Sequence, residues 1–172
     1  KAEEIVTSVR SYAKEQKLKK SPLSVNEVVT EAVKDFTSTL QDYPLQIEFE
    51  EDPRSPICSL APLEFELAVF NLLKNAKEAL KAQKADEPKL FIKLSSSETH
   101  CFVDISDNGA VISDSDFERM GSVFKSGKAS GLGIGLSIVR SIVQNHNGSL
   151  VLERGKNGGL VCRIRLPIFN AE

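Results

Sequence analysis

Residues Ser130–Val139 read SGLGIGLSIV, with three glycines spaced two apart that run directly into an apolar helical pattern. Glycine has no Cβ, and the first turn of a helix leaves backbone N–H groups without intrahelical partners. Together these features form a seat for phosphate. The same spacing also occurs in plain loops and in dinucleotide-binding turns, so the flanking sequence has to decide between them.

The residues before the glycines argue against a dinucleotide-binding turn. Such a turn needs a buried strand just before the glycines, inside a βαβ unit. Ser122–Ala129 is instead small, polar and basic, which is typical of a loop. We therefore expect Gly121–Ser130 to be mobile when no ligand is bound.

Composition limits the classes of protein that fit. The 172 residues, 41% of them hydrophobic, can bury the core of one main domain. The net charge of -2 provides no basic field, so nucleic acid is not an expected partner. Cys58, Cys101 and Cys162 lie far apart in apolar contexts, which favours reduced core residues and a reducing, cytoplasmic compartment. The sequence contains no apolar run long enough to span a membrane, and we expect no membrane contact.

Hydrophobic periodicity predicts a mixture of helices and strands. The expected helices cover 1–20, a segment from a cap at Ser24–Asn26 to Pro44, a long segment from Pro62 through Leu80, and Gly133–Asn145. The expected strands are Leu45–Glu50, Ile57–Leu60, Lys89–Ser95, Cys101–Ser106, Ser149–Glu153 and Leu160–Leu166. Helices mixed with antiparallel strands predict a two-layer α+β sandwich. Because Lys1 lies inside a helical pattern, we expect the chain to be part of a longer protein.

Polar residues in three places could carry chemistry, although each also has a plain structural explanation. Asn71 and Asn75 share one face of the long helix, and an amide oxygen can coordinate Mg²⁺, but an asparagine on a helix often just faces solvent. Asp107 precedes Asn108 and Gly109, where its carboxylate could accept a hydrogen bond from adenine or simply belong to a turn. Lys128 could neutralise a phosphate or be solvated.

In their order and spacing these elements resemble the ATP-binding domain of sensor histidine kinases. Asn71–Ala79 resembles the N box, Asp107–Gly109 the G1 box, Phe117–Lys128 the F box with the ATP lid, and Gly131–Gly135 the G2 box. The resemblance covers Leu23–Pro167. It implies the Bergerat fold shared with gyrase, Hsp90 and MutL, in which a mixed, mostly antiparallel sheet packs on three helices.

The resemblance also implies ligands, domains and partners. It implies ATP and Mg²⁺ as cofactors, residues 1–20 as the end of a second dimerisation helix, and residues 21–172 as the catalytic domain. The implied partners are the dimerisation domain of a homodimeric parent protein and the receiver domain of a response regulator. The resemblance leaves open whether the parent protein is anchored in the inner membrane. The implied ATP-binding residues are Asn71, Asn75, Lys77, Asp107, Gly109, Ile112, Lys128, Gly131, Leu132, Gly133, Gly135 and Leu136, with Asn75 as the Mg²⁺ ligand.

The resemblance further predicts which reaction this chain can perform. ATP-hydrolysing relatives carry a glutamate as general base four residues before the metal asparagine, whereas this chain has Asn71, which cannot act as a base. We therefore expect the γ-phosphoryl group to go to a protein histidine. His100 begins a strand and His146 ends a helix, where it caps carbonyl groups, so neither has the phosphoacceptor context of the family. We expect this chain to bind ATP without phosphorylating itself.

Three positions depart from the pattern of the family. Val111 replaces the second glycine of the G1 box, and because valine resists the φ values of glycine and crowds a ligand, we expect weaker nucleotide binding or an altered loop path. Glu78 replaces a basic residue, for which Lys77 compensates only in part. Val161–Arg163 differs from the Thr and Phe that relatives often carry.

Two alternatives to a histidine kinase stay open on the sequence alone. One is a degenerate, non-catalytic module of the same fold that senses nucleotide or docks a partner, with turnover abolished by Val111. The other is a serine kinase of the anti-sigma type, which shares the fold but lacks the dimerisation helix.

Overall fold

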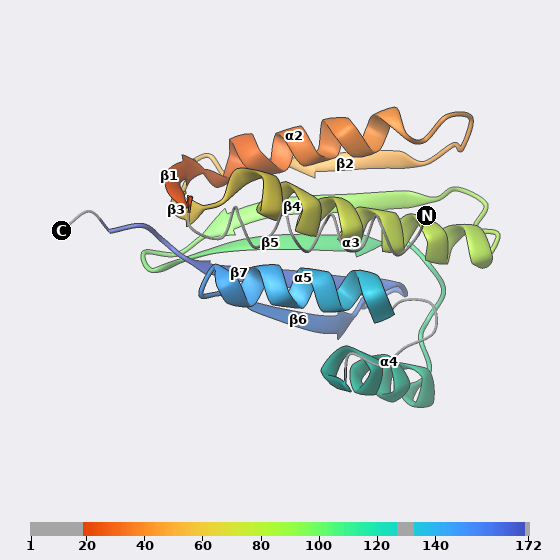
Figure 1. Cartoon of the computed structure of the whole chain (residues 1–172). Coiled ribbons are helices and arrows are strands. Elements are labelled where there is room, and N and C mark those ends of the chain that lie inside the picture. The colour runs from red at the N-terminus through yellow and green to blue at the C-terminus, as the bar shows by residue number, and fades with distance from the viewer. Residues whose placement is uncertain (1–18, 127–132, 171–172) are drawn as a thin grey trace, which may run out of the picture.

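The computed structural model describes residues 19–126 and 133–170. The main sheet has five strands in the order β2-β4-β5-β7-β6 (Figure 1). β2 pairs with β4 in parallel, and the other neighbouring pairs are antiparallel. The strands are β2 (Gln46–Glu50), β4 (Lys89–Ser96), β5 (His100–Asp107), β6 (Ser149–Arg154) and β7 (Leu160–Pro167).

Three helices form a layer over this sheet, while α4 lies apart from it (Figure 1). The helices are α2 (Val25–Ser38), α3 (Pro62–Ala82), α4 (Asp114–Ser126) and α5 (Gly133–Asn145), and α3 packs between α2 and α5. The arrangement confirms the predicted α+β sandwich with a mixed, mostly antiparallel sheet. The helix expected over residues 1–20 falls outside the described part of the chain except for its last two residues, which are not helical.

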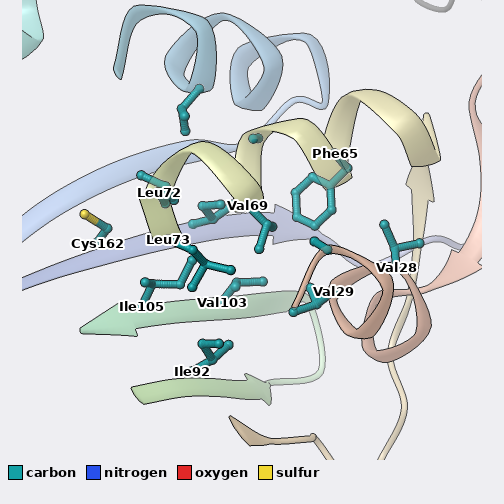
Figure 2. Close-up of a cluster of buried hydrophobic side chains, with 14 of the residues drawn as sticks. Val28, Val29, Phe65, Val69, Leu72, Leu73, Ile92, Val103, Ile105 and Cys162 are labelled. Carbon is teal, nitrogen blue, oxygen red and sulfur yellow. The ribbon is translucent and has the colours of Figure 1, made fainter. Parts of the chain in front are cut away.

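The core fills the space between the helices and the sheet (Figure 2). Val69 and Leu73 on α3 are buried together with Ile92 on β4 and Val103 on β5. Their spacing explains the local structure, because apolar residues recur every three or four positions along α3 and every second position along the strands. The three cysteines are free and buried, as predicted.

The structure corrects two expected elements near the N-terminus. Ser21–Ser24, where no strand was expected, forms a strand, β1, that pairs antiparallel with β3 (Ile57–Leu60). α2 starts where predicted, since the hydroxyl of Ser24 accepts a hydrogen bond from the N–H of Glu27 at its N-terminus. It ends at Ser38 rather than near Pro44, with Thr39 as its C-cap, and the turn that follows has a positive φ at Gln41.

The prediction of a loop over Ser122–Ala129 is also wrong for residues 122–126, which are helical. α4 continues through Ser126, and the remaining positions lie outside the described residues. No helix in residues 19–126 and 133–170 is long and apolar enough to cross a membrane.

A buried histidine links the end of α5 to the start of α3. The backbone N–H of Ala61, just before α3, donates to Nε2 of His146 at 3.1 Å, so this nitrogen carries no proton. Nδ1 therefore carries the proton and donates to the carbonyl of Ile142 at 2.7 Å. The contact with a helix carbonyl is as predicted from the sequence, whereas the bond from Ala61 was not expected. Burial lowers the pKa of His146 below its ordinary value of 6.5.

We expect this histidine to make stability depend on pH. Between the lowered pKa and 6.5 the unfolded chain binds a proton that the folded chain does not, so the free energy of unfolding decreases as the pH falls below 6.5. The contribution of one such group approaches about 1.4 kcal/mol per pH unit. Urea denaturation between pH 7.5 and 5 measures it.

The chain has only two histidines, and the second provides the control. His146→Gln should flatten the dependence of stability on pH below 6.5 more than His100→Gln does, because His146 is buried and His100 lies near the surface. An equal pH dependence in the His146 variant would contradict the assignment.

Candidate functional site

A cavity of about 720 Å³ opens between α3, α4, α5 and the ends of β5 and β7. Apolar side chains such as Leu72, Ile105 and Leu136 form most of its walls. The polar side chains that line it are Asn75, Gln83, Asp107, Asp116 and Arg119. An apolar cavity with a few convergent polar groups suits a flat organic ligand that carries hydrogen-bonding atoms.

Asp107 ends β5 inside this cavity. Its Oδ1 accepts a hydrogen bond from the N–H of Gly109 at 2.8 Å, and its Oδ2 accepts one from the N–H of Leu160 at 3.3 Å. Burial raises the pKa of Asp107 above its ordinary value, although the two N–H groups oppose this. Because a carboxylate offers about four acceptor positions, the side chain keeps capacity for a ligand donor.

Glycines hold the backbone close around Asp107. A Cβ added at Gly109 would lie 2.6 Å from Oδ1 of Asp107, and one added at Gly159 would lie 2.2 Å from its carbonyl oxygen. Gly159 also has a φ of +74°, which side-chain-bearing residues rarely adopt. Its N–H donates to the carbonyl of Ala110 at 2.9 Å, so the β6–β7 turn fixes the loop after Asp107.

Asn75 lies on the helical side of the cavity, against the first turn of α5. A Cβ added at Gly135 would lie 3.2 Å from both Nδ2 and Oδ1 of Asn75. Nδ2 is buried and has no hydrogen-bond partner within the described part of the chain. A buried amide without a partner costs free energy, so the geometry fits a ligand that completes the hydrogen bonding of this side chain.

The structure brings only some of the predicted site residues to the cavity. Ile112 and Leu136 line it together with Asn75 and Asp107. Gly109 does not line it, but its N–H donates to Oδ1 of Asp107. The side chain of Asn71 turns back to its own helix and donates to the carbonyl of Leu67 at 2.9 Å. The ammonium of Lys77 lies 5.8 Å from the centre of the Phe36 ring, on the side of α3 that contacts α2.

The glycine-rich stretch is described only in part. Gly133 begins α5, and Gly135 contacts Asn75. Lys128, Gly131 and Leu132 lie outside the described residues, so their predicted contacts with phosphate stay predictions.

Val111 lines the mouth of the cavity, with 81% of its surface exposed. The expected backbone conflict is absent, because the described non-glycine residues with positive φ are Gln41, Ser55, Lys84 and Asn147. Crowding of the ligand is the remaining reason for Val111 to weaken binding.

We expect Val111→Gly to tighten ATP binding by about 1 kcal/mol at most, or about fivefold in Kd. The gain is small because the valine side chain is mostly exposed and can turn away from a ligand. Calorimetric titration with Mg-ATP measures the change, and unchanged affinity would show that Val111 does not limit binding.

Several cavity residues were not found by sequence analysis. Oε1 of Gln83 accepts a hydrogen bond from the N–H of Ala110 at 2.8 Å. Cys162 lies beside Asp107, and burial, with a smaller contribution from that carboxylate, raises the pKa of its thiol to about 12. α4 adds Asp116, Arg119 and Met120. Gln83 and Asp116 belong to none of the motifs in the sequence, and Arg119 and Met120 lie within the F-box segment Phe117–Lys128 but were not named singly.

Comparisons with known proteins agree with this geometry. The family profile described as histidine kinase-, DNA gyrase B-, and HSP90-like ATPase matches residues 61–170. The C4-dicarboxylate transport sensor protein DctS of Rhodobacter capsulatus is 26% identical over 95% of this chain, and the sensor protein FixL of Bradyrhizobium diazoefficiens is 26% identical over 97%. The chain spans 25% of the length of DctS and 33% of that of FixL.

Solved structures show the same fold. The nucleotide-free catalytic domain of the histidine kinase ThkA superposes with a TM-score of 0.74 at 24% identity, over 87% of this chain and 97% of that domain. A structure of ThkA in complex with the response regulator protein TrrA gives a TM-score of 0.74 at 22% identity, over 98% of this chain and 47% of that one. Because the family profile matches residues 61–170, more than half of this chain, the chain belongs to the histidine kinase-, DNA gyrase B- and HSP90-like ATPases.

Proposed function

We propose that this chain is the ATP-binding catalytic domain of a sensor histidine kinase. In this proposal it transfers the γ-phosphoryl group of Mg-ATP to a histidine on a dimerisation domain outside the chain. The observation that carries the proposal is the pairing of Asp107 and Asn75 across one apolar cavity, with the start of α5 beside Asn75.

The Asp107 side of the cavity suits adenine. The exocyclic amine of the base would donate to the carboxylate of Asp107, while apolar residues such as Ile105 and Ile112 would contact the faces of the ring. The carboxylate is already oriented by the N–H groups of Gly109 and Leu160, so binding requires little reorganisation.

The Asn75 side of the cavity suits the phosphates. N–H groups at the start of α5, from Gly133 onward, have no partners within the helix and carry a positive dipole end, so they favour an anion. Asn75 would hold Mg²⁺ through its amide oxygen, and the ion would neutralise charge on the phosphates. Within residues 19–126 and 133–170, no group of three or more His, Cys, Asp or Glu side chains could hold a metal ion. Besides Asn75, most ligands of the Mg²⁺ would therefore be phosphate oxygens and water.

The position of Asn71 supports transfer to a protein over hydrolysis. An amide cannot remove a proton from water, and that of Asn71 donates to the carbonyl of Leu67.

The proposal assigns residues 1–20 to the end of the second dimerisation helix and 21–172 to the catalytic domain. A response regulator receiver domain would accept the phosphoryl group from the histidine, and the reaction would take place in the cytoplasm.

Two measurements on the 172-residue chain test the proposal. Calorimetry with Mg-ATP should show binding, and a supplied dimerisation domain from the longer parent protein should become phosphorylated on histidine. Binding without transfer would favour the degenerate nucleotide-sensing module, for which Val111 at the mouth of the cavity is the supporting feature. Absence of nucleotide binding would contradict both.

A further inference from the structure

α4 forms one wall of the cavity but is packed shallowly. Asp116, Arg119 and Met120 on this helix line the cavity. Within its described side chains, residues 114–122, none is buried. Figure 1 shows the helix standing apart from the sheet and the other helices. Because little apolar surface is buried there, discrete polar contacts contribute a large share of what holds this wall in place.

One side chain, Arg154, joins the sheet to α4 through two contacts and to the segment just before α4 through a third. Its Nη1 lies 2.5 Å from Oδ1 of Asp114 in the first turn of α4. The same nitrogen donates to the carbonyl of Ile112 at 3.2 Å, and the guanidinium carbon lies 5.3 Å from the centre of the Phe117 ring. Arg154 ends β6, so it reaches α4 from a paired strand.

The three contacts need an arginine. A guanidinium is planar and carries five N–H donors, so it can bond a carboxylate and a carbonyl while a ring lies against it. A lysine would keep the charge but could not hold all three groups in one geometry. Arg154 itself does not line the cavity.

We propose that Arg154 is a positioning residue for nucleotide binding, because it holds α4 in place as a wall of the cavity. The identity of the ligand in this inference rests on the proposed function, whereas the attachment of α4 by Arg154 does not depend on it. It predicts that loss of Arg154 loosens α4 first and weakens nucleotide binding as a consequence.

The chain contains a matched control, Arg163 on β7. Its Nε and Nη2 bond the two carboxylate oxygens of Asp104 at 2.7 and 2.9 Å, and its guanidinium carbon lies 5.6 Å from the centre of the Phe102 ring. The side chains of Arg154 and Arg163 are 43% and 44% exposed. Arg163 neighbours Cys162, which lines the cavity, so strand alternation directs Arg163 to the opposite face of the sheet.

The test combines amide hydrogen exchange with calorimetry on the 172-residue chain. In Arg154→Ala we expect the backbone amides of α4 to exchange about five- to thirtyfold faster without nucleotide, from the loss of an exposed ion pair, a hydrogen bond and a cation–π contact. We expect Mg-ATP to bind about three- to tenfold more weakly. In Arg154→Lys, the exchange rate of α4 and the affinity for Mg-ATP should lie between those of the unsubstituted chain and those of Arg154→Ala. Arg163→Ala should change neither the exchange of α4 nor the affinity.

Each outcome decides a separate step. Unchanged exchange of α4 in Arg154→Ala would overturn the attachment, and faster exchange with unchanged affinity would overturn the role of α4 in binding. An equal effect of Arg163→Ala would show a general loss of stability and would also overturn the proposal. If the unsubstituted chain bound no nucleotide, the proposed function would fail, and the exchange measurement would still decide whether Arg154 holds α4.

Discussion

Asp107→Asn is expected to weaken Mg-ATP binding by about 10- to 100-fold, the range for losing a hydrogen bond to a charged group. The amide replaces an acceptor that can face the adenine amine with a group that carries two donors of its own. In the unsubstituted chain each carboxylate oxygen accepts from one N–H group, that of Gly109 or that of Leu160. In the variant the amide nitrogen would take the place of one of these oxygens and would face an N–H donor. Calorimetric titration measures the change in Kd.

The same strand offers a control for this substitution. Asp104 lies three residues earlier on β5, pairs with Arg163 and lies away from the cavity. Asp104→Asn should alter stability slightly and leave nucleotide affinity unchanged. A second titration with Mg-GTP adds a test of selectivity, because guanine presents a carbonyl where adenine presents the amine. If Asp107→Asn bound Mg-ATP as tightly as the unsubstituted chain, Asp107 would not recognise adenine.

Most of the fold could be predicted because its signals are local. Pro62 begins α3, and the alternation of buried residues along β4 and β5 follows the sequence directly. β1 was missed because Ser21–Ser24 is short and contains Pro22, and its strand character comes from pairing with β3. α4 was taken for a loop beyond Gly121 because the stretch that starts at Ser122 is small, polar and basic, a composition typical of a loop.

The candidate site was predictable to the extent that each residue belongs to a short motif. Asp107 and Asn75 could be named from their neighbours in the sequence, and both line the cavity. Lys77 was named for its charge, but its place on α3 directs it to Phe36. Gln83, Cys162 and Arg154 could not be assigned to the site, because each reaches it through a contact with a distant segment that only the folded chain brings close.

Asn75→Ala is expected to slow phosphoryl transfer to a supplied histidine domain by about 100- to 1,000-fold, the range for removing one preorganised electrostatic contact. The variant loses the amide oxygen that would hold Mg²⁺. The dependence of nucleotide affinity on Mg²⁺ should fall with it, which calorimetry with and without the ion measures. Asn75→Asp keeps an oxygen ligand and should retain more of the Mg²⁺ dependence than Asn75→Ala.

The stability of the same variant separates a functional from a structural role. Nδ2 of Asn75 is buried without a partner in the described part of the chain, and alanine favours a helix more than asparagine does. Asn75→Ala should therefore unfold at the same or a higher urea concentration than the unsubstituted chain. A marked loss of stability would show that the amide supports the fold. Slower transfer in an equally stable protein would mean that this buried amide is kept, against its cost to folding, for its ligand.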